Sequence, residues 1–200
     1  MNEYLYIGDE DYFYPNASVL KNKLGITDEK ALETAERKIT SMKLFMLRMD
    51  KFAGNFDFEH LSYIHKFIFG DIYEWAGNLR TGEFFAKGSS VFCRGQFLKT
   101  YISEIFTKLS KEKYLCNLNK NEFIERTAYF MGEINALHPF REGNGRTLRE
   151  FFRQLSENAG YELNFSKSKK DGLLNADISA FNGNYQPLIK ILGSAVKGIG

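Results

Sequence analysis

The sequence predicts a mainly α-helical fold. Apolar residues recur at helical spacing in several long segments, and residues that favour helix starts and ends flank those segments. The 200 residues have a globular composition, 44% hydrophobic and 26% charged, with only three prolines to interrupt helices. No linker rich in serine, proline or glycine divides the chain, so we expect a single domain over residues 1–200.

Two helices are expected in the N-terminal third. Thr27 is the predicted N-cap of the first, acidic residues follow it, and Gly54 ends the pattern. Its apolar positions recur at helical spacing: Leu32, Ala35, Ile39, Met42 and Met46. Asp57 is the predicted N-cap of the second helix, which should stop near Gly70.

Four more helices are expected. The third runs from about Gln96 to Lys111, and its apolar face is Phe97, Tyr101, Ile105 and Leu109. The fourth and fifth, about residues 121–137 and 144–158, form a helix–loop–helix over about 121–158. The fourth has a clean apolar stripe: Phe123, Thr127, Phe130, Ile134 and Leu137. The last helix follows Asn184, with Pro187 in its first turn.

Residues 79–93 are the exception to the helical pattern. Gly82 and Gly88 separate two short β-prone pieces, and the run from Lys87 to Ser90 has the composition of a turn. We predict a β-hairpin here. Two interpretations remain open: a surface excursion, or a flap available for pairing with another chain.

Charge and hydropathy exclude several classes of protein. The net charge is only +2, without the basic stripe of a nucleic-acid binder. No apolar run is long enough to cross a membrane, and the first residues lack the basic start of a signal peptide, so we expect a cytoplasmic location. Export by a route without a cleaved signal stays open. Cys93 and Cys116 match neither a disulfide framework nor a zinc site.

The loop between the fourth and fifth helices has the composition of an anion site. Pro139 ends the preceding helix and leaves His138 at its lip. Gly143 and Gly145 flank Asn144 where the next helix opens, and glycines let the backbone approach a ligand. Because amide groups at a helix start have no partner within the helix and face its positive dipole end, they bind anions.

Charged residues complete this candidate site. Arg146 and Arg149 are three apart, so they share one face of the first helical turn and suit a polyphosphate. Glu142 offers an acidic oxygen beside phosphates, a common position for a Mg²⁺ ligand. His138 can accept a proton from an attacking hydroxyl, because the ordinary pKa of histidine lies near working pH.

The segment from His138 to Arg149, HPFREGNGRTLR, resembles the signature of the Fic family, H-P-F-x-[D/E]-G-N-G-R-x-x-R, at every fixed position. Members of that family also have a hairpin flap upstream, here around residues 86–92. The resemblance covers most of residues 10–165. It implies a Fic-type helical bundle with a small β-hairpin flap beside the active-site loop.

The resemblance also implies an activity. Most Fic proteins transfer AMP from ATP to a Ser, Thr or Tyr hydroxyl of a target protein. His138 would then be the general base, and Glu142 would ligate the Mg²⁺ that bridges the α- and β-phosphates. Gly143, Asn144 and Gly145 would form an anion hole. Arg146 would contact the β-phosphate and Arg149 the γ-phosphate, and Phe140 would anchor the loop in the core.

The resemblance leaves some chemistry open. Gly145 favours AMP transfer, because Doc-type relatives that phosphorylate have Lys there. Phosphocholine transfer, removal of AMP, and a non-catalytic nucleotide-binding regulatory module remain alternatives. The flap, at Lys87, Gly88 and Ser89, would hold the target by strand addition.

One family feature is absent from the sequence. Many Fic proteins inhibit themselves through a helix of pattern [S/T]-x-x-x-E-[G/N], whose Glu pairs with the second motif arginine, here Arg149. Glu precedes Gly or Asn only at Glu142 and Glu157, and His138 and Arg153 stand four residues before them. We therefore predict that a separate antitoxin-like protein supplies any such helix, as expected for a toxin or effector.

Overall fold

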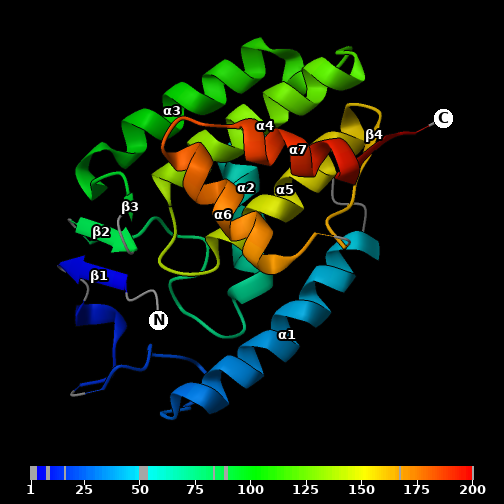
Figure 1. Cartoon of the computed structure of the whole chain (residues 1–200). Helices are drawn as coiled ribbons and strands as arrows, with labels where there is room; N and C mark the ends of the chain where they lie inside the picture. The colour runs from blue at the N-terminus through cyan, green and yellow to red at the C-terminus, as the bar shows by residue number, and fades with distance from the viewer. Residues whose placement is uncertain are drawn as a thin grey trace.

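The computed structural model describes residues 4–7, 10–15, 17–49, 54–82, 84–87, 90–166 and 168–199. The predicted mainly helical fold is confirmed (Figure 1). The α-helices are α1 (Glu29–Met49), α2 (Phe58–Phe69), α3 (Gly95–Lys111), α4 (Lys120–Leu137), α5 (Asn144–Asn158), α6 (Lys170–Phe181) and α7 (Gln186–Ala195). Two 3₁₀ turns, Glu10–Tyr12 and Lys113–Leu115, connect other elements.

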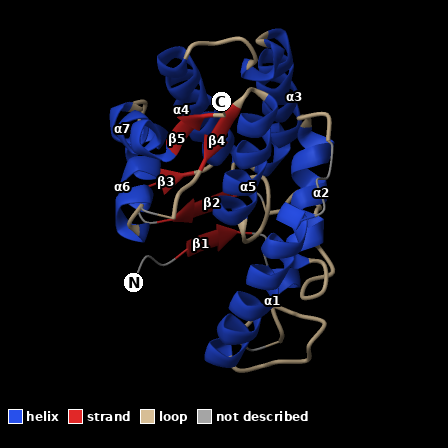
Figure 2. Ribbon diagram, turned by 90° about the vertical axis from the view of Figure 1, so that its right-hand side faces the viewer, coloured by secondary structure: helices blue, strands red, loops and turns tan. Residues whose placement is uncertain are grey.

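The strands form two small antiparallel sheets (Figure 2). In one, β2 (Phe84–Lys87) lies between β1 (Tyr4–Ile7) and β3 (Ser90–Val91). In the other, β4 (Tyr161–Leu163) pairs with β5 (Val196–Gly198). The hairpin predicted over 79–93 is therefore confirmed, but β1, β4 and β5 were not predicted, because strands of three or four residues leave too short a pattern to detect.

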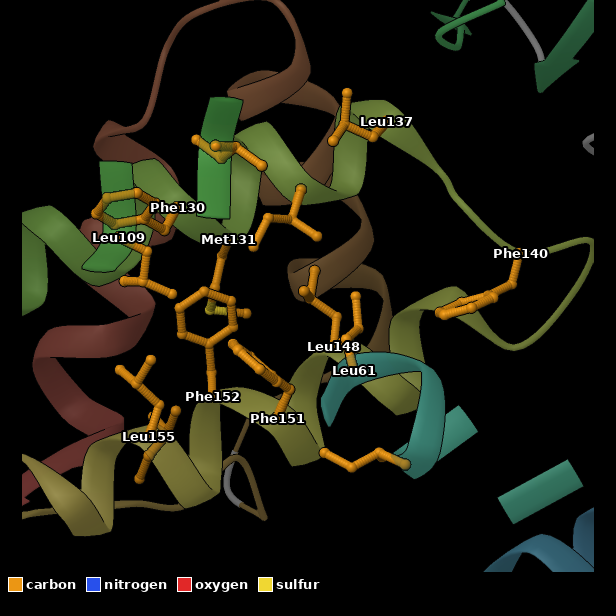
Figure 3. Close-up of a cluster of buried hydrophobic side chains, with 14 of the residues drawn as sticks. Leu61, Leu109, Phe130, Met131, Leu137, Phe140, Leu148, Phe151, Phe152 and Leu155 are labelled. Atoms are coloured by element: carbon orange, nitrogen blue, oxygen red, sulfur yellow. The ribbon is translucent and has the colours of Figure 1, made fainter. Parts of the chain in front are cut away.

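The hydrophobic core lies where α2, α4 and α5 meet. Phe151 and Phe152 of α5 are fully buried and point toward Phe130 and Met131 of α4, with Leu61 of α2 beside them (Figure 3). Burying one such side chain stabilises the fold by roughly 1.5–3 kcal/mol. The stripe predicted for α4 is buried along its whole length. This core fixes the two helices that carry the candidate site.

Several predicted helix ends are confirmed. Asp57 caps α2, accepting a hydrogen bond from the His60 amide at 2.8 Å, and Gly70 follows the last residue of the helix. The ends of α5 lie where the sequence places them. The cap of α1 was misplaced by one residue: the Asp28 carboxylate, not Thr27, accepts the amide at the third helical position, at 2.8 Å. Residues 50–53, before Gly54, lie outside the described residues.

Two predicted apolar faces are wrong in part. On α1, Met42 and Met46 are 55% and 42% exposed, whereas Leu32, Thr40 and Leu47 face inward. On α3, Phe97 and Tyr101 face solvent. Both helices carry two apolar stripes, and spacing alone does not tell which of them is buried. The inner face of α1 includes polar residues because it borders the candidate site.

Helix α6 was not predicted. Its buried residues are two alanines, Ala176 and Ala180, and its larger apolar residues lie on several sides, so the sequence shows no single stripe. Among the helices of the described ranges, none has the length and apolar character needed to cross a membrane.

Candidate active site

The motif residues line one cleft. Residues at the start of α5 line it together with residues of α1 and α6, and its volume is about 840 Å³. This volume lies within the range of small-molecule sites. The predicted site residues that border the cavity are His138, Glu142, Gly143, Asn144, Gly145, Arg146 and Arg149. The structure therefore brings together every motif residue that was predicted to act on the nucleotide, the metal or the target hydroxyl.

His138 ends α4 in a left-handed conformation, with φ 48° and ψ 61°. Its ring stacks on Phe92 at a centroid distance of 4.0 Å and lies 5.1 Å from Phe85, both from the hairpin region. Its Nδ1 is 3.4 Å from the carbonyl oxygen of Asn135. The hairpin thus orients the histidine as well as bordering it.

Arg80, which was not predicted from the sequence, joins the hairpin region to the end of α4. It is 4% exposed, and its Nε donates to the His138 carbonyl oxygen at 2.7 Å. Its Nη2 donates to the carbonyl oxygens of Cys93 and Leu137. Carbonyls at a helix end lack partners within the helix. Arg80 satisfies two of them, Leu137 and His138, and so fixes the backbone of the histidine.

Gly143 is required at the start of α5. Its φ is +81°, and a Cβ built there would lie 2.2 Å from the ring of Phe69. Asn144, 6% exposed, bridges the loop: its side chain accepts from the Phe140 amide at 2.9 Å and donates to the Phe140 carbonyl at 2.7 Å. The side chain of Asn144 therefore braces the loop.

His65 supports the same loop from below. Its Nδ1 accepts a hydrogen bond from the Gly77 amide at 2.8 Å, so its Nε2 carries the proton and donates to the Glu142 carbonyl at 2.9 Å. Burial lowers the pKa of His65 to about 4, which keeps the ring neutral. Phe140, 1% exposed, stacks on this ring at 4.0 Å, as expected for a core anchor.

The two arginines have different partners. Arg146 Nη2 lies 2.7 Å from Glu36 Oε1 of α1, and its Nη1 lies 3.3 Å from Thr40 Oγ1. Arg149 faces Asp177 of α6, and its side chain forms no hydrogen bond or ion pair with any residue that the structure describes. Burial raises the pKa of Asp177 to about 6, although Arg149 opposes that rise. Neither carboxylate was found from the sequence, because contacts between distant helices leave no local pattern.

Glu142 is the only motif residue with a carboxylate. Its Oε1 accepts the Gly143 amide at 3.0 Å and lies 3.8 Å from Arg146 Nη2, and its side chain is 30% exposed. No cluster of three or more His, Cys, Asp or Glu side chains suited to a metal occurs in the described part of the chain. Because Mg²⁺ is commonly held by one or two carboxylates together with substrate phosphates, a single accessible carboxylate fits that ion.

The hairpin differs from an open flap. Strand β2 pairs with β3 on one side and with β1 on the other, with Lys87 opposite both Tyr4 and Ser90. Both edges of β2 are therefore occupied. Gly88 and Ser89, predicted to contact a target, lie outside the described residues, as does the side chain of Lys87.

Comparison with known proteins agrees with the resemblance found in the motif. The model of the Fic/DOC family matches residues 55–156. The chain is 42% identical over 180 residues to protein adenylyltransferase VbhT of Bartonella schoenbuchensis, a match covering 90% of this chain and 37% of VbhT. It is 32% identical over 193 residues to the probable protein adenylyltransferase Fic of Escherichia coli, covering 96% of this chain and 95% of that protein.

A solved structure has the same fold. The BepC protein of Bartonella tribocorum, a VirB-translocated effector crystallised with bound AMPPNP, matches with a TM-score of 0.89 and 28% identity, over 94% of this chain and 97% of that one. The expected Fic-type helical bundle is confirmed. Sequence and structure agree over nearly the whole chain: it belongs to the Fic/DOC family.

Proposed function

We propose that this chain transfers AMP from ATP to a Ser, Thr or Tyr hydroxyl of a target protein. The observation that carries the proposal is the convergence of His138, the start of α5 and two arginines in one cleft. The names of VbhT and the E. coli relative, and the AMPPNP bound to BepC, support it. Because the chain spans only 37% of VbhT, the activity of the whole protein remains part of the proposal.

The proton transfer is assigned to His138. When Nδ1–H donates to the Asn135 carbonyl, Nε2 is unprotonated and accepts the proton of the target hydroxyl. The hydroxyl oxygen then bonds to the α-phosphorus, the bond from that phosphorus to the bridging oxygen breaks, and pyrophosphate leaves. Stacking on Phe92 keeps the ring in one orientation, so that little ordering is required during the reaction.

The phosphates are assigned to the start of α5. The first residues of the helix, including Asn144 and Gly145, line the cavity, and their backbone amides would form the anion hole. Arg146 would contact the β-phosphate and Arg149 the γ-phosphate. Glu142 would hold Mg²⁺, which supplies charge neutralisation to the phosphates when bound.

The adenine is assigned to an apolar part of the cavity lining. There α6 and the segment before it contribute apolar side chains: Phe165, Leu173, Leu174, Ile178 and Phe181. An apolar wall with few polar groups suits a flat heterocycle. The lining thus offers polar groups for phosphates and apolar side chains for a base.

The target is assigned to the three-stranded sheet. Since both edges of β2 are paired, a target strand would add to the outer edge of β1 or β3, or replace β1. We also propose a single domain, because one core cluster runs from Val19 to Val196. An antitoxin-like partner, whose Glu would meet Arg149, remains a prediction, as do a toxin role and a cytoplasmic location.

The test is incubation of the full chain with α-labelled ATP, Mg²⁺ and cell lysate, beside His138→Ala. We expect labelled protein with the wild type and at least a hundredfold less with the variant, a loss typical of removing a general base. Both should bind ATP equally, which separates chemistry from binding. Equal labelling by His138→Ala would refute the base assignment, and label arriving only from γ-labelled ATP would indicate a kinase. Label arriving only from phosphocholine donors would indicate that alternative.

A further inference from the structure

Arg146 is held on three sides. Glu36 accepts from its Nη2 at 2.7 Å, Thr40 lies 3.3 Å from its Nη1, and its Cζ lies 4.7 Å from the centre of the Phe69 ring. Thr40 and Phe69 are 2% and 0% exposed. An arginine side chain has more N–H donors than these two hydrogen bonds use, and the remaining ones are available to a ligand in the cleft.

Glu36 is itself held by a second residue. The hydroxyl of Tyr73, in the segment after α2, donates to Glu36 Oε2 at 2.5 Å. Tyr73 is 1% exposed and stacks on Trp75 at 4.4 Å. Burial and the nearby Glu36 carboxylate raise the pKa of Tyr73 far above its usual value, so the phenol remains a donor. Each oxygen of Glu36 thus has its own partner.

We propose that Glu36 and Tyr73 are positioning residues that hold Arg146 in place for the β-phosphate of the nucleotide. The inference rests on the assignment of Arg146 under the proposed function. A free arginine has roughly 2 kcal/mol of rotamer entropy to lose on binding, and a side chain already fixed by Glu36 has less of it to lose. The chain Tyr73–Glu36–Arg146 links three separate parts of the sequence.

The surroundings of Glu36 favour a role in supporting Arg146 over a role in inhibiting ATP binding. An inhibitory carboxylate has to leave the arginine when ATP binds. Glu36 has a side-chain exposure of only 14%, and both of its oxygens are engaged, one by a phenol packed in the core. Because these neighbours are buried and closely packed, the carboxylate has little freedom to move away.

If Glu36 acted through its charge alone, removing it would change nucleotide affinity in the opposite direction from that expected if it positions Arg146. Removing any carboxylate from an anion site strengthens polyphosphate binding, whichever carboxylate is removed. Removing one that orients Arg146 weakens the contribution of the β-phosphate specifically. The affinity ratio of ADP to AMP isolates that contribution, since the two ligands differ by the β-phosphate alone.

The experiment is calorimetric titration of the full chain with ADP and with AMP, at one Mg²⁺ concentration, in wild type, Glu36→Gln and Glu33→Gln. Glu33 is the matched control: it lies on α1, borders the same cleft, loses the same charge, and pairs with Arg37. We expect the ADP to AMP affinity ratio to fall about tenfold in Glu36→Gln, as for one lost charge-assisted hydrogen bond. In Glu33→Gln the ratio should stay the same or rise, because losing a carboxylate charge alone favours the more highly charged ADP.

Tyr73→Phe provides a second test of the inference, because it removes the hydrogen bond to Glu36 without changing any charge. It should lower the same ratio by about threefold, and combined with Glu36→Gln it should add little, because both changes act through one arginine. An unchanged or higher ratio in both variants would overturn the inference, and a higher ratio would show that Glu36 competes with phosphate. If the wild type itself does not prefer ADP to AMP, the assignment of Arg146 to the β-phosphate fails, and the inference fails with it.

Discussion

Arg146 and Arg149 lie one helical turn apart on α5, yet their surroundings are opposite. Arg146 forms an ion pair with Glu36 of α1 and contacts Thr40. Arg149 faces Asp177 of α6, and within the described ranges its side chain has no hydrogen bond or ion pair. Residues of both α1 and α6 line the cleft. Arg146 is therefore fixed before a ligand arrives, whereas Arg149 keeps its charge available.

The largest effect should separate the two arginines. Arg149→Ala should weaken ATP binding about 30-fold but leave ADP binding nearly unchanged, because its full charge is assigned to the γ-phosphate. Arg146→Ala should weaken ADP relative to AMP and lower kcat more than it raises KM. Calorimetry and steady-state kinetics with ATP measure both. Equal effects of the two variants on every ligand would remove the distinction.

The loop beneath both arginines should affect them together. Asn144→Ala leaves the buried amide and carbonyl of Phe140 without partners, which should lower the free energy of unfolding by about 2 kcal/mol. AMP transfer should fall by at least an order of magnitude, while the ADP to AMP and ATP to ADP ratios stay constant. Urea denaturation measures the stability, and the exposed Asn121→Ala on α4 is the control. A selective change in one ratio would show that Asn144 serves one arginine.

Asp177 should make the α6 side sensitive to pH. Its pKa in the folded chain, about 6, lies above the unfolded value of about 3.9, so the charged form destabilises the fold above pH 6. This penalty disappears as pH falls through 6 toward 4. Asp177→Asn should therefore be more stable than the wild type by about 2 kcal/mol at about pH 7.5, and by less at about pH 5.

The same substitution tests the charge of Arg149. Asp177→Asn should bind ATP several-fold more tightly than the wild type above pH 6, and the two affinities should converge below it. Taking the ratio of the two proteins cancels the titration of ATP itself. The exposed Asp171→Asn at the start of α6 is the control. Weaker ATP binding by Asp177→Asn at every pH would show that Asp177 positions Arg149, as Glu36 is proposed to position Arg146.

The smallest effect on nucleotides should come from the sheet. A variant lacking strand β1 should change ATP affinity less than twofold, because β1 pairs with β2 rather than with the motif loop. Its KM for a protein target should change by a larger factor, since an edge of β2 becomes available. Kinetics at varied target concentration measure this. A large change in ATP affinity would mean that β1 supports the cleft.

Particular residues show which features could be predicted from the sequence. The helix–loop–helix and the glycines were predictable because caps, periodicity and a tight turn are local patterns, and Gly143 is confirmed by its φ and by the contact with Phe69. The buried face of α1 was not, because Met42 and Met46 follow the same spacing as a core stripe. The supports of the motif, Arg80 and Glu36, come from distant segments.

The family and the set of motif residues that meet in the cleft could be predicted because one contiguous segment contains them. The mainly helical fold could be predicted because apolar residues recur at helical spacing along the chain. Three features could be seen only in the folded chain: the carboxylate that faces each arginine, the residues that hold His138 in place, and the pairing of β1 with an edge of the hairpin. The physical reason is that these contacts depend on how helices rotate and pack against one another, and the lowest free energy of that packing is a property of the whole chain.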